Sequence, residues 1–172
     1  NDRNAPGLFD SGDPLFVRAA RLLDRYREAG LMLATAESCT GGMVAALLTE
    51  IPGSSAVVER GFVTYSNEAK NEAIGVPMEL IQSHGAVSPQ VAQAMAEGAL
   101  KHSRADAAVA ITGVAGPGGG TDAKPVGLVQ FAAVRRGRPA FRVEKMYGEI
   151  GRAGIRRAAV ETALGLFEDL LD

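Results

Sequence analysis

Short apolar runs alternate with amphipathic stretches along most of the chain. The apolar runs predict strands over residues 31–36, 57–65, 107–111, 126–134 and 139–147. The amphipathic stretches have apolar residues at helical spacing and predict helices over residues 15–29, 43–50, 67–74, 89–99 and 152–171. Because strands alternate with helices until a final hairpin, the pattern predicts an α/β fold: a three-layer α/β/α sandwich with a mixed, mostly parallel sheet that contains one antiparallel strand.

The first fourteen residues lack this apolar periodicity. They combine Pro, Gly, Asp and Asn, a composition typical of chain ends. We therefore expect a flexible leader over residues 1–14 and a single domain over residues 15–172. With 172 residues and 47% hydrophobic side chains, the chain is large enough to bury the core of one domain.

Polar and glycine-rich sequences follow three of the predicted strands. SCTGG begins at Ser38, TYSNEAK begins at Thr64, and TGVAGPGGG begins at Thr112. In open parallel sheets, ligands bind beyond the carboxyl ends of the strands. The three sequences therefore predict a site at one end of the sheet.

Ser38 is the candidate nucleophile of this site. It lies where a strand turns into a helix, so its hydroxyl can point away from the sheet while the amides near Thr40 to Gly42 point at an oxyanion or a phosphate. Gly41 and Gly42 would let a ligand approach the backbone closely. The alternative is that Ser38 or Thr40 only caps the helix, because capping serines are far more common than nucleophilic ones.

Lys70 is the candidate base for Ser38. Neither His84 nor His102 lies near a predicted strand end with an acidic partner, which disfavours a Ser-His-Asp triad. A desolvated Lys70 would have a lowered pKa and could take the serine proton directly or through the hydroxyl of Tyr65. The alternative is a lysine that is simply solvated on its helix.

The glycine loop that follows Thr112 is a candidate phosphate cradle. Its spacing matches neither the P-loop nor the dinucleotide fingerprint, so a lid or a connector remains an alternative. Lys124 could neutralise an anion there or be solvated.

Cys39 is an alternative nucleophile, because a thiol at a helix start has a lowered pKa. Alternatively, it is a small core residue. Glu37 is either an acid behind the site or the partner of a nearby base.

Charge and cysteine content narrow the function classes. The formal net charge is -2, so no global positive field attracts nucleic acid or an anionic membrane. One cysteine cannot form an internal disulfide, and no apolar run is long enough to span a membrane, so we expect a cytoplasmic protein. Two isolated histidines and no clustered ligands give no metal-binding spacing, so we expect no metal and no cofactor.

Taken together, the motifs resemble those of the carboxy-terminal domain family of the competence and damage-inducible protein CinA. TAESCTGG, IPGSS, RGFVTYSNEAK, GAVS, TGVAGPGGG and KPVG occur in that family's order, over roughly residues 15–171. The family fold is likewise a three-layer sandwich. Larger members carry an additional amino-terminal domain, for which this chain has no room, and it therefore looks like the stand-alone form. Stand-alone members are nicotinamide mononucleotide amidohydrolases, and the resemblance also implies a homo-oligomer.

The resemblance implies roles for individual residues. Ser38 would be the nucleophile, Tyr65 and Lys70 its activating partners, and Thr112 and Arg152 further active-site residues. The chain departs from the family in reading YGEIGR, where Gly151 replaces an acid before Arg152. Arg156 could therefore supply the guanidinium instead. The predicted substrate-binding residues are Glu37, Thr40, Gly41, Gly42, Thr112, Gly113, Gly116 and Arg152.

These inferences predict an enzyme with a small-molecule substrate. We expect it to deamidate nicotinamide mononucleotide to the nicotinate nucleotide and ammonia, in pyridine nucleotide recycling, without binding nucleic acid or membrane. A non-catalytic nucleotide-binding module, in which Ser38 only caps its helix, is the alternative. An amidase for a different pyridine or purine nucleotide is a third possibility.

Overall fold

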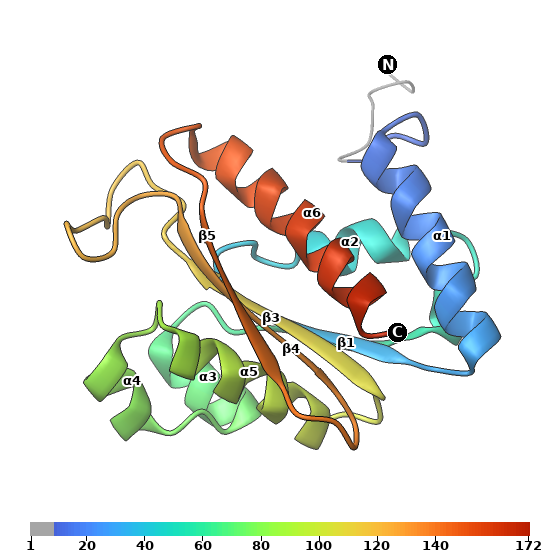
Figure 1. Cartoon of the computed structure of the whole chain (residues 1–172), viewed down its shortest axis with the longest axis horizontal. Helices are drawn as coiled ribbons and strands as arrows, with labels where there is room; N and C mark the ends of the chain where they lie inside the picture. Colours follow the sequence, from blue (N-terminus) through green and yellow to red (C-terminus); the bar gives the residue numbers. More distant parts are fainter. Residues whose placement is uncertain (1–8) are drawn as a thin grey trace, which may run out of the picture.

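A computed structural model describes residues 9–172 as a sheet covered on both faces by helices (Figure 1). The five strands are β1 (Leu33–Glu37), β2 (Val58–Val63), β3 (Ala107–Gly113), β4 (Leu128–Arg135) and β5 (Phe141–Met146). Their order in the sheet is β2-β1-β3-β4-β5. β1 is parallel to β2 and to β3, whereas β4 is antiparallel to both β3 and β5. The predicted mixed sheet with one antiparallel strand is confirmed.

The helices form two outer layers (Figure 1). α1 (Pro14–Ala29), α2 (Met43–Thr49) and α6 (Arg152–Asp169) cover one face of the sheet, and α3 (Asn67–Ile74), α4 (Met78–His84) and α5 (Pro89–Lys101) cover the other. A short 3-10 helix, η1 (Ser54–Ala56), precedes β2. The predicted α/β/α sandwich is therefore confirmed.

The two faces of the sheet carry side chains of different size. Because successive strand residues point to opposite faces, each central strand supplies both cores. The face toward α5 carries only alanines from β1 and from the first half of β3, whereas the opposite face carries larger residues such as Leu33, Ile111 and Phe131. Small side chains allow α5 to pack close to the sheet, which holds the whole layer of α3, α4 and α5 near the site.

The start of the described chain differs from the expected leader. Residues 1–8 lie outside the described residues, but Phe9 is 3% exposed and belongs to the core. The side chain of Asp13 accepts a hydrogen bond from the amide of Leu15, so α1 begins at Pro14. An aromatic residue and a capping aspartate in a Gly- and Pro-rich stretch are thus enough to fix residues 9–14 against the domain.

Two elements were not anticipated from the sequence. α4 has seven residues and only one of them, Ile81, is buried, so its apolar periodicity is too weak to detect. η1 spans three residues and follows Gly53. β2 ends at Val63, two residues before the predicted end at Tyr65. These differences shift element boundaries and leave the topology unchanged.

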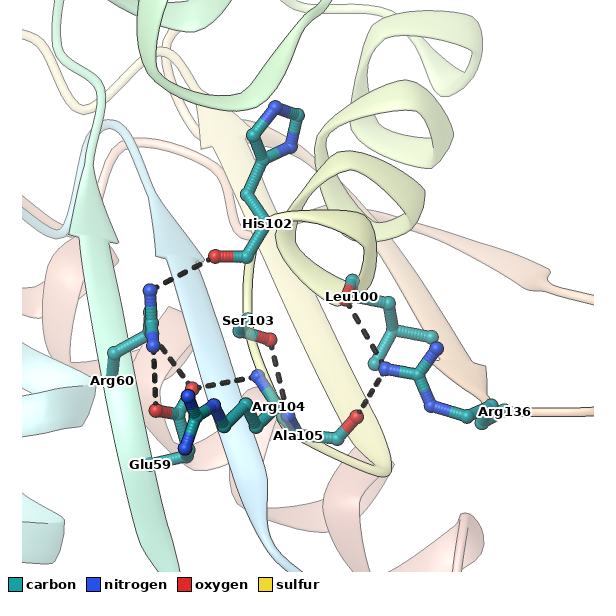
Figure 2. A network of polar contacts seen from close by, with 8 residues as sticks. All are labelled: Glu59, Arg60, Leu100, His102, Ser103, Arg104, Ala105 and Arg136. Atoms are coloured by element: carbon teal, nitrogen blue, oxygen red, sulfur yellow. Dashed lines mark hydrogen bonds and ion pairs between the residues drawn. The ribbon is translucent and has the colours of Figure 1, made fainter.

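Arginine side chains fix the connection between α5 and β3 at the end of the sheet opposite to the predicted site (Figure 2). The guanidinium of Arg136 donates to the carbonyls of Leu100 and Ala105. Arg60 donates to the carbonyl of His102, and Glu59 accepts from the amide of Arg104. Hydrogen bonds to backbone carbonyls thus satisfy a helix end that would otherwise lack partners.

Gly98 provides a direct test of the packing of α5. A Cβ atom at Gly98 would lie 2.0 Å from the carbonyl oxygen of Ile74, which is backbone and cannot move freely. We expect Gly98→Ala to destabilise the protein by about 2 kcal/mol or more. Gly165→Ala is the matched control within α6, because its Cβ would meet only the flexible end of Arg18 at 3.1 Å. That variant should gain about 0.5–1 kcal/mol, and equal thermal midpoints for the two would contradict the packing.

Over residues 9–172, no helix is both long and apolar enough to cross a membrane.

Candidate active site

Ser38 directly follows β1 and is held by the sheet. Its amide donates to the carbonyl of Ile111 at 2.9 Å, which extends the pairing of β1 with β3 by one residue. Its carbonyl accepts from the amide of Gly41 at 3.0 Å and closes the turn into α2. The residue is 8% exposed. The backbone of the candidate nucleophile is therefore fixed on both sides.

Lys70 reaches Ser38 from α3. Its Nζ lies 3.0 Å from the Oγ of Ser38 and donates to the carbonyl of Thr64 at 2.8 Å. α3 begins after Ser66, whose hydroxyl accepts from the amide of Ala69, and this cap sets the helix so that Lys70 points inward. The structure thus brings together two of the predicted catalytic residues.

The environment of Lys70 disfavours its charged form. The residue is 1% exposed, and within residues 9–172 no carboxylate forms an ion pair with it. Burial lowers the pKa of the Lys70 ammonium below its ordinary value of 10.5. A neutral amine can accept a proton, so its contact with the Ser38 hydroxyl is the arrangement that general-base activation requires.

A cavity of about 300 Å³ opens beside this pair. That volume is at the lower end of the range for small-molecule sites. Its wall includes the predicted residues Ser38, Tyr65, Lys70, Thr112, Gly113, Gly116 and Arg152. The carboxyl ends of β1 and β3, the start of α3 and the start of α6 therefore meet there, as the three sequences after the strands predicted.

Arg152 spans the cavity between its two sides. Its guanidinium donates to the carbonyl of Gly116 at 2.8 Å and to the hydroxyl of Tyr65 at 3.2 Å. Tyr65 is 63% exposed, and no hydrogen bond joins it to Ser38 or Lys70 within residues 9–172. Both contacts of Arg152 are to neutral oxygens, which leaves its positive charge available to an anionic ligand.

Comparison with protein families places the chain in one of them. The family model described as the CinA C-terminal domain matches residues 17–171. The chain belongs to this family.

Proteins related to this CinA-family chain differ in length. A CinA-like protein of Mycobacterium sp. (strain JLS) is 48% identical over 172 residues, which is 99% of this chain but 39% of that protein. The chain thus spans about two-fifths of the length of that relative. The nicotinamide-nucleotide amidohydrolase PncC of Escherichia coli (strain K12) is 56% identical over 136 residues, covering 78% of this chain and 81% of PncC.

Solved structures of the CinA superfamily share the fold. The competence/damage inducible protein CihA from Agrobacterium tumefaciens is 51% identical, with a TM-score of 0.93 over 96% of this chain and 99% of that one. A CinA superfamily protein from Klebsiella pneumoniae is 34% identical, with a TM-score of 0.87 over 92% of this chain and 98% of that one.

Four of the predicted binding residues of this CinA-family domain do not line the cavity. Glu37 and Thr40 are both 0% exposed. Glu37 accepts from the Thr40 hydroxyl at 2.6 Å and from the amides of Val44 and Ala45. Its carboxylate therefore caps the first turn of α2. Gly41 and Gly42 have φ values of 57° and 101°, which turn the chain away from the cavity and into the helix. None of these four residues forms part of the cavity wall, and their contact with a ligand stays a prediction.

Cys39 is a poor alternative to Ser38. It is 6% exposed, and burial raises the pKa of its thiol to about 11. A thiol with that pKa is almost entirely protonated at neutral pH, and the thiolate is the nucleophilic form. Cys39 touches the cavity, but its environment lacks the lowered pKa that its position at a helix start had suggested.

The glycine loop is tied to the connection between α4 and α5. The Thr112 hydroxyl donates to the carbonyl of Ala86 at 2.9 Å. Lys124 donates to the carbonyl of His84, at the end of α4, and does not line the cavity. Gly113 and Gly116 have no side chains, so only their backbone atoms line the cavity. This loop projects between β3 and β4 at the left of Figure 1.

Sequence reasoning missed three further residues of the wall. Asn67 is the first residue of α3, and Ala86 and Val87 belong to the segment before α5. Asn67 lies within the TYSNEAK sequence between Tyr65 and Lys70, so its position alone could have identified it. Ala86 and Val87 have no reactive groups, and the hydrogen bond from the Thr112 hydroxyl to the Ala86 carbonyl holds their segment beside the cavity.

Proposed function

We propose that the chain hydrolyses the carboxamide of nicotinamide mononucleotide, which gives nicotinate mononucleotide and ammonia. The observation that carries this proposal is the buried Lys70 amine 3.0 Å from the Ser38 hydroxyl, inside a cavity of small-molecule size. The substrate follows from the similarity to PncC of Escherichia coli, whose name states this activity. The resemblance of the motifs supports the same reaction.

In the proposed reaction, Ser38 Oγ attacks the carboxamide carbon while neutral Lys70 accepts the hydroxyl proton. The C–N bond then breaks, and the proton held on Lys70 is delivered to the departing nitrogen, which leaves as ammonia. A water molecule then attacks the resulting ester and gives one proton to Lys70. The bond between the acyl carbon and Ser38 Oγ breaks, and Lys70 returns that proton to Ser38 Oγ. The released acid loses its remaining proton and is the nicotinate nucleotide. Oxygen and proton are thus supplied by water, and no metal or organic cofactor is required.

Direct proton transfer between Ser38 and Lys70 is favoured over a relay through Tyr65. The Lys70 amine contacts Ser38 Oγ itself, whereas Tyr65 contacts Arg152. Tyr65 also lines the cavity, and we propose that it assists the transfer of the proton to the leaving nitrogen. Lys70 is the base in either step.

Arg152, Thr112, Gly113 and Gly116 also line the cavity and would hold the ribose phosphate. The guanidinium of Arg152 would provide the positive charge for the phosphate. Binding energy from this remote group can position the reacting carboxamide against Ser38.

We also propose that the protein is a homo-oligomer and that it is located in the cytoplasm. The family resemblance supports the homo-oligomer, and the single cysteine supports the cytoplasmic location.

A substrate panel tests the proposed activity. Purified protein with a chelator present should release ammonia from nicotinamide mononucleotide, and release should be much slower from nicotinamide riboside and from free nicotinamide, which lack the phosphate. Product identity is checked by chromatography. Tight nucleotide binding without ammonia release would favour a non-catalytic nucleotide-binding module. Faster release from another nucleotide amide would redirect the substrate assignment, and loss of activity with chelator would overturn the metal-free reaction.

A further inference from the structure

Arg156 contacts the turn that carries Ser38, although it lies far from it in the sequence. It is one helical turn after Arg152 on α6. Its Nε donates to the carbonyl of Cys39 at 3.1 Å, and its Nη2 lies 3.3 Å from the carbonyl oxygen of Thr40. One guanidinium therefore holds two successive carbonyls directly after the candidate nucleophile.

Backbone hydrogen bonds close this turn, from the amide of Gly41 to the carbonyl of Ser38 and from the amide of Met43 to the carbonyl of Thr40, but it also contains two glycines. Gly41 and Gly42, both in the left-handed region, follow Thr40, and glycine gives the backbone the most conformational freedom. A Cβ at Gly41 would lie 3.3 Å from Nη2 of Arg156, so the guanidinium packs directly on the glycine. A side chain from α6 thus adds a restraint to the hydrogen bonds within the turn.

The contacts of Arg156 set the direction of the peptide groups. In a planar trans peptide, the C=O and the following N–H point in opposite directions. Holding the Cys39 carbonyl on the α6 side therefore directs the Thr40 N–H away from α6. Glu37 holds the Thr40 hydroxyl as well, so this one residue is fixed by a carboxylate and a guanidinium from separate elements.

Arg156 differs from the arginine next to it. Arg157 forms an ion pair with Asp13 at 2.6 Å near the start of α1. Within residues 9–172, Arg156 forms no ion pair, and its guanidinium donates to backbone carbonyls alone. It also does not line the cavity, whereas Arg152 does. Its contacts therefore match neither a surface ion pair nor a ligand contact.

We propose that Arg156 is a positioning residue that fixes the Ser38–Gly42 turn and thereby the orientation of the Ser38 nucleophile. Its catalytic consequence rests on the proposed amidohydrolase function, but its structural consequence does not. Arg152 then acts on the ligand and Arg156 on the enzyme backbone, and the two arginines have separate tasks.

Kinetics test the catalytic consequence. Arg156→Met keeps the aliphatic stem and removes both donors, and we expect kcat to fall roughly 10²-fold with little change in KM, because small displacements of a reacting group have effects of that size. Arg157→Met is the matched control and should keep the wild-type kcat. In Arg156→Ala, added guanidinium ion should restore part of the lost kcat. An unchanged kcat in Arg156→Met would overturn the proposed effect on the nucleophile.

Cys39 offers a readout that does not depend on catalysis. It is the single cysteine of the chain, it is 6% exposed, and its own carbonyl is the one that Arg156 holds. Alkylation of Cys39 by iodoacetamide should be at least roughly tenfold faster in Arg156→Met than in Arg157→Met, because a turn released from its restraint opens locally at lower free-energy cost. Equal alkylation rates would overturn the positioning role, even if the wild-type protein proves inactive on nicotinamide mononucleotide. If Arg156→Met is alkylated faster but the wild-type protein releases no ammonia, only the proposed function is rejected.

Discussion

Ser38→Ala should reduce the release of ammonia from nicotinamide mononucleotide by at least roughly 10³-fold, since removal of a serine nucleophile leaves only binding and polarisation of the substrate. Ser38 Oγ is the atom that Lys70 contacts and that faces the cavity. The substitution removes one buried hydroxyl, so the fold should persist. Steady-state kinetics give the loss of turnover, and calorimetry should still detect nucleotide binding.

The neighbouring thiol provides the control for Ser38. Cys39→Ala should retain activity within a small factor, because burial raises the pKa of that thiol to about 11 and keeps it protonated. A wild-type rate in Ser38→Ala would reject the serine mechanism and return Cys39 to consideration. In Cys39→Ala, an acyl-enzyme trapped by rapid acid quench, with the added mass on the peptide that contains Ser38, would exclude the thiol as the acylated group.

Lys70→Met should also abolish turnover, but without loss of thermal stability at neutral pH. Methionine fills a similar volume without an amine to deprotonate, and the wild-type protein must bury that amine at a cost. Sites tuned for function commonly reduce stability, so an inactive variant with a thermal midpoint equal to or above that of the wild type is the expected result. A midpoint several degrees lower would assign Lys70 a mainly structural role.

The pH dependence follows from the direction of the pKa shift. Burial lowers the pKa of Lys70 in the folded protein, whereas the unfolded chain keeps its ordinary value of 10.5. Between these two values the unfolded state binds more protons, so the wild-type free energy of unfolding rises with pH there. The advantage of Lys70→Met should therefore be largest at low pH and decrease as the pH approaches 10.5. Turnover should rise over the same range as Lys70 becomes neutral.

Lys101→Met is a matched control for both measurements. Lys101 is exposed in the last turn of α5, so its amine stays hydrated in the folded and unfolded states. This variant should keep the wild-type activity and show no pH-dependent difference in thermal midpoint. A similar response in both lysine variants would mean that net charge, and not burial of Lys70, causes the effect.

Much of the fold follows from local signals in the sequence. α3 spans Asn67–Ile74 as predicted, because Ser66 caps its start and Gly75 ends it in the left-handed conformation. α5 starts at Pro89 after Ser88 for the same kind of reason. α4 was not predicted, because a seven-residue helix with one buried side chain leaves no periodic pattern.

The lining of the cavity was predicted less completely than the fold, because Glu37, Thr40, Gly41 and Gly42 do not belong to it. The sequence TAESCTGG indicates a turn after a strand, but it does not say which of its residues face the cavity. The Thr40 hydroxyl donates to Glu37, and Glu37 also accepts from two amides of α2. The polar groups of both side chains therefore form hydrogen bonds within the protein. Their polarity suggested a ligand, whereas a helix start buried under a sheet needs such partners itself.

By itself, the sequence determined the α/β architecture, the position of the site at the carboxyl ends of the strands, and Ser38 and Lys70 as candidates. These follow from periodicity and capping, which depend on neighbours along the chain. Only the tertiary structure decided that Lys70 reaches Ser38, that Arg152 lines the cavity, and that Arg156 holds the turn. Those contacts join segments up to 117 residues apart. Their distances and burial depend on how the layers pack, and no local pattern encodes that.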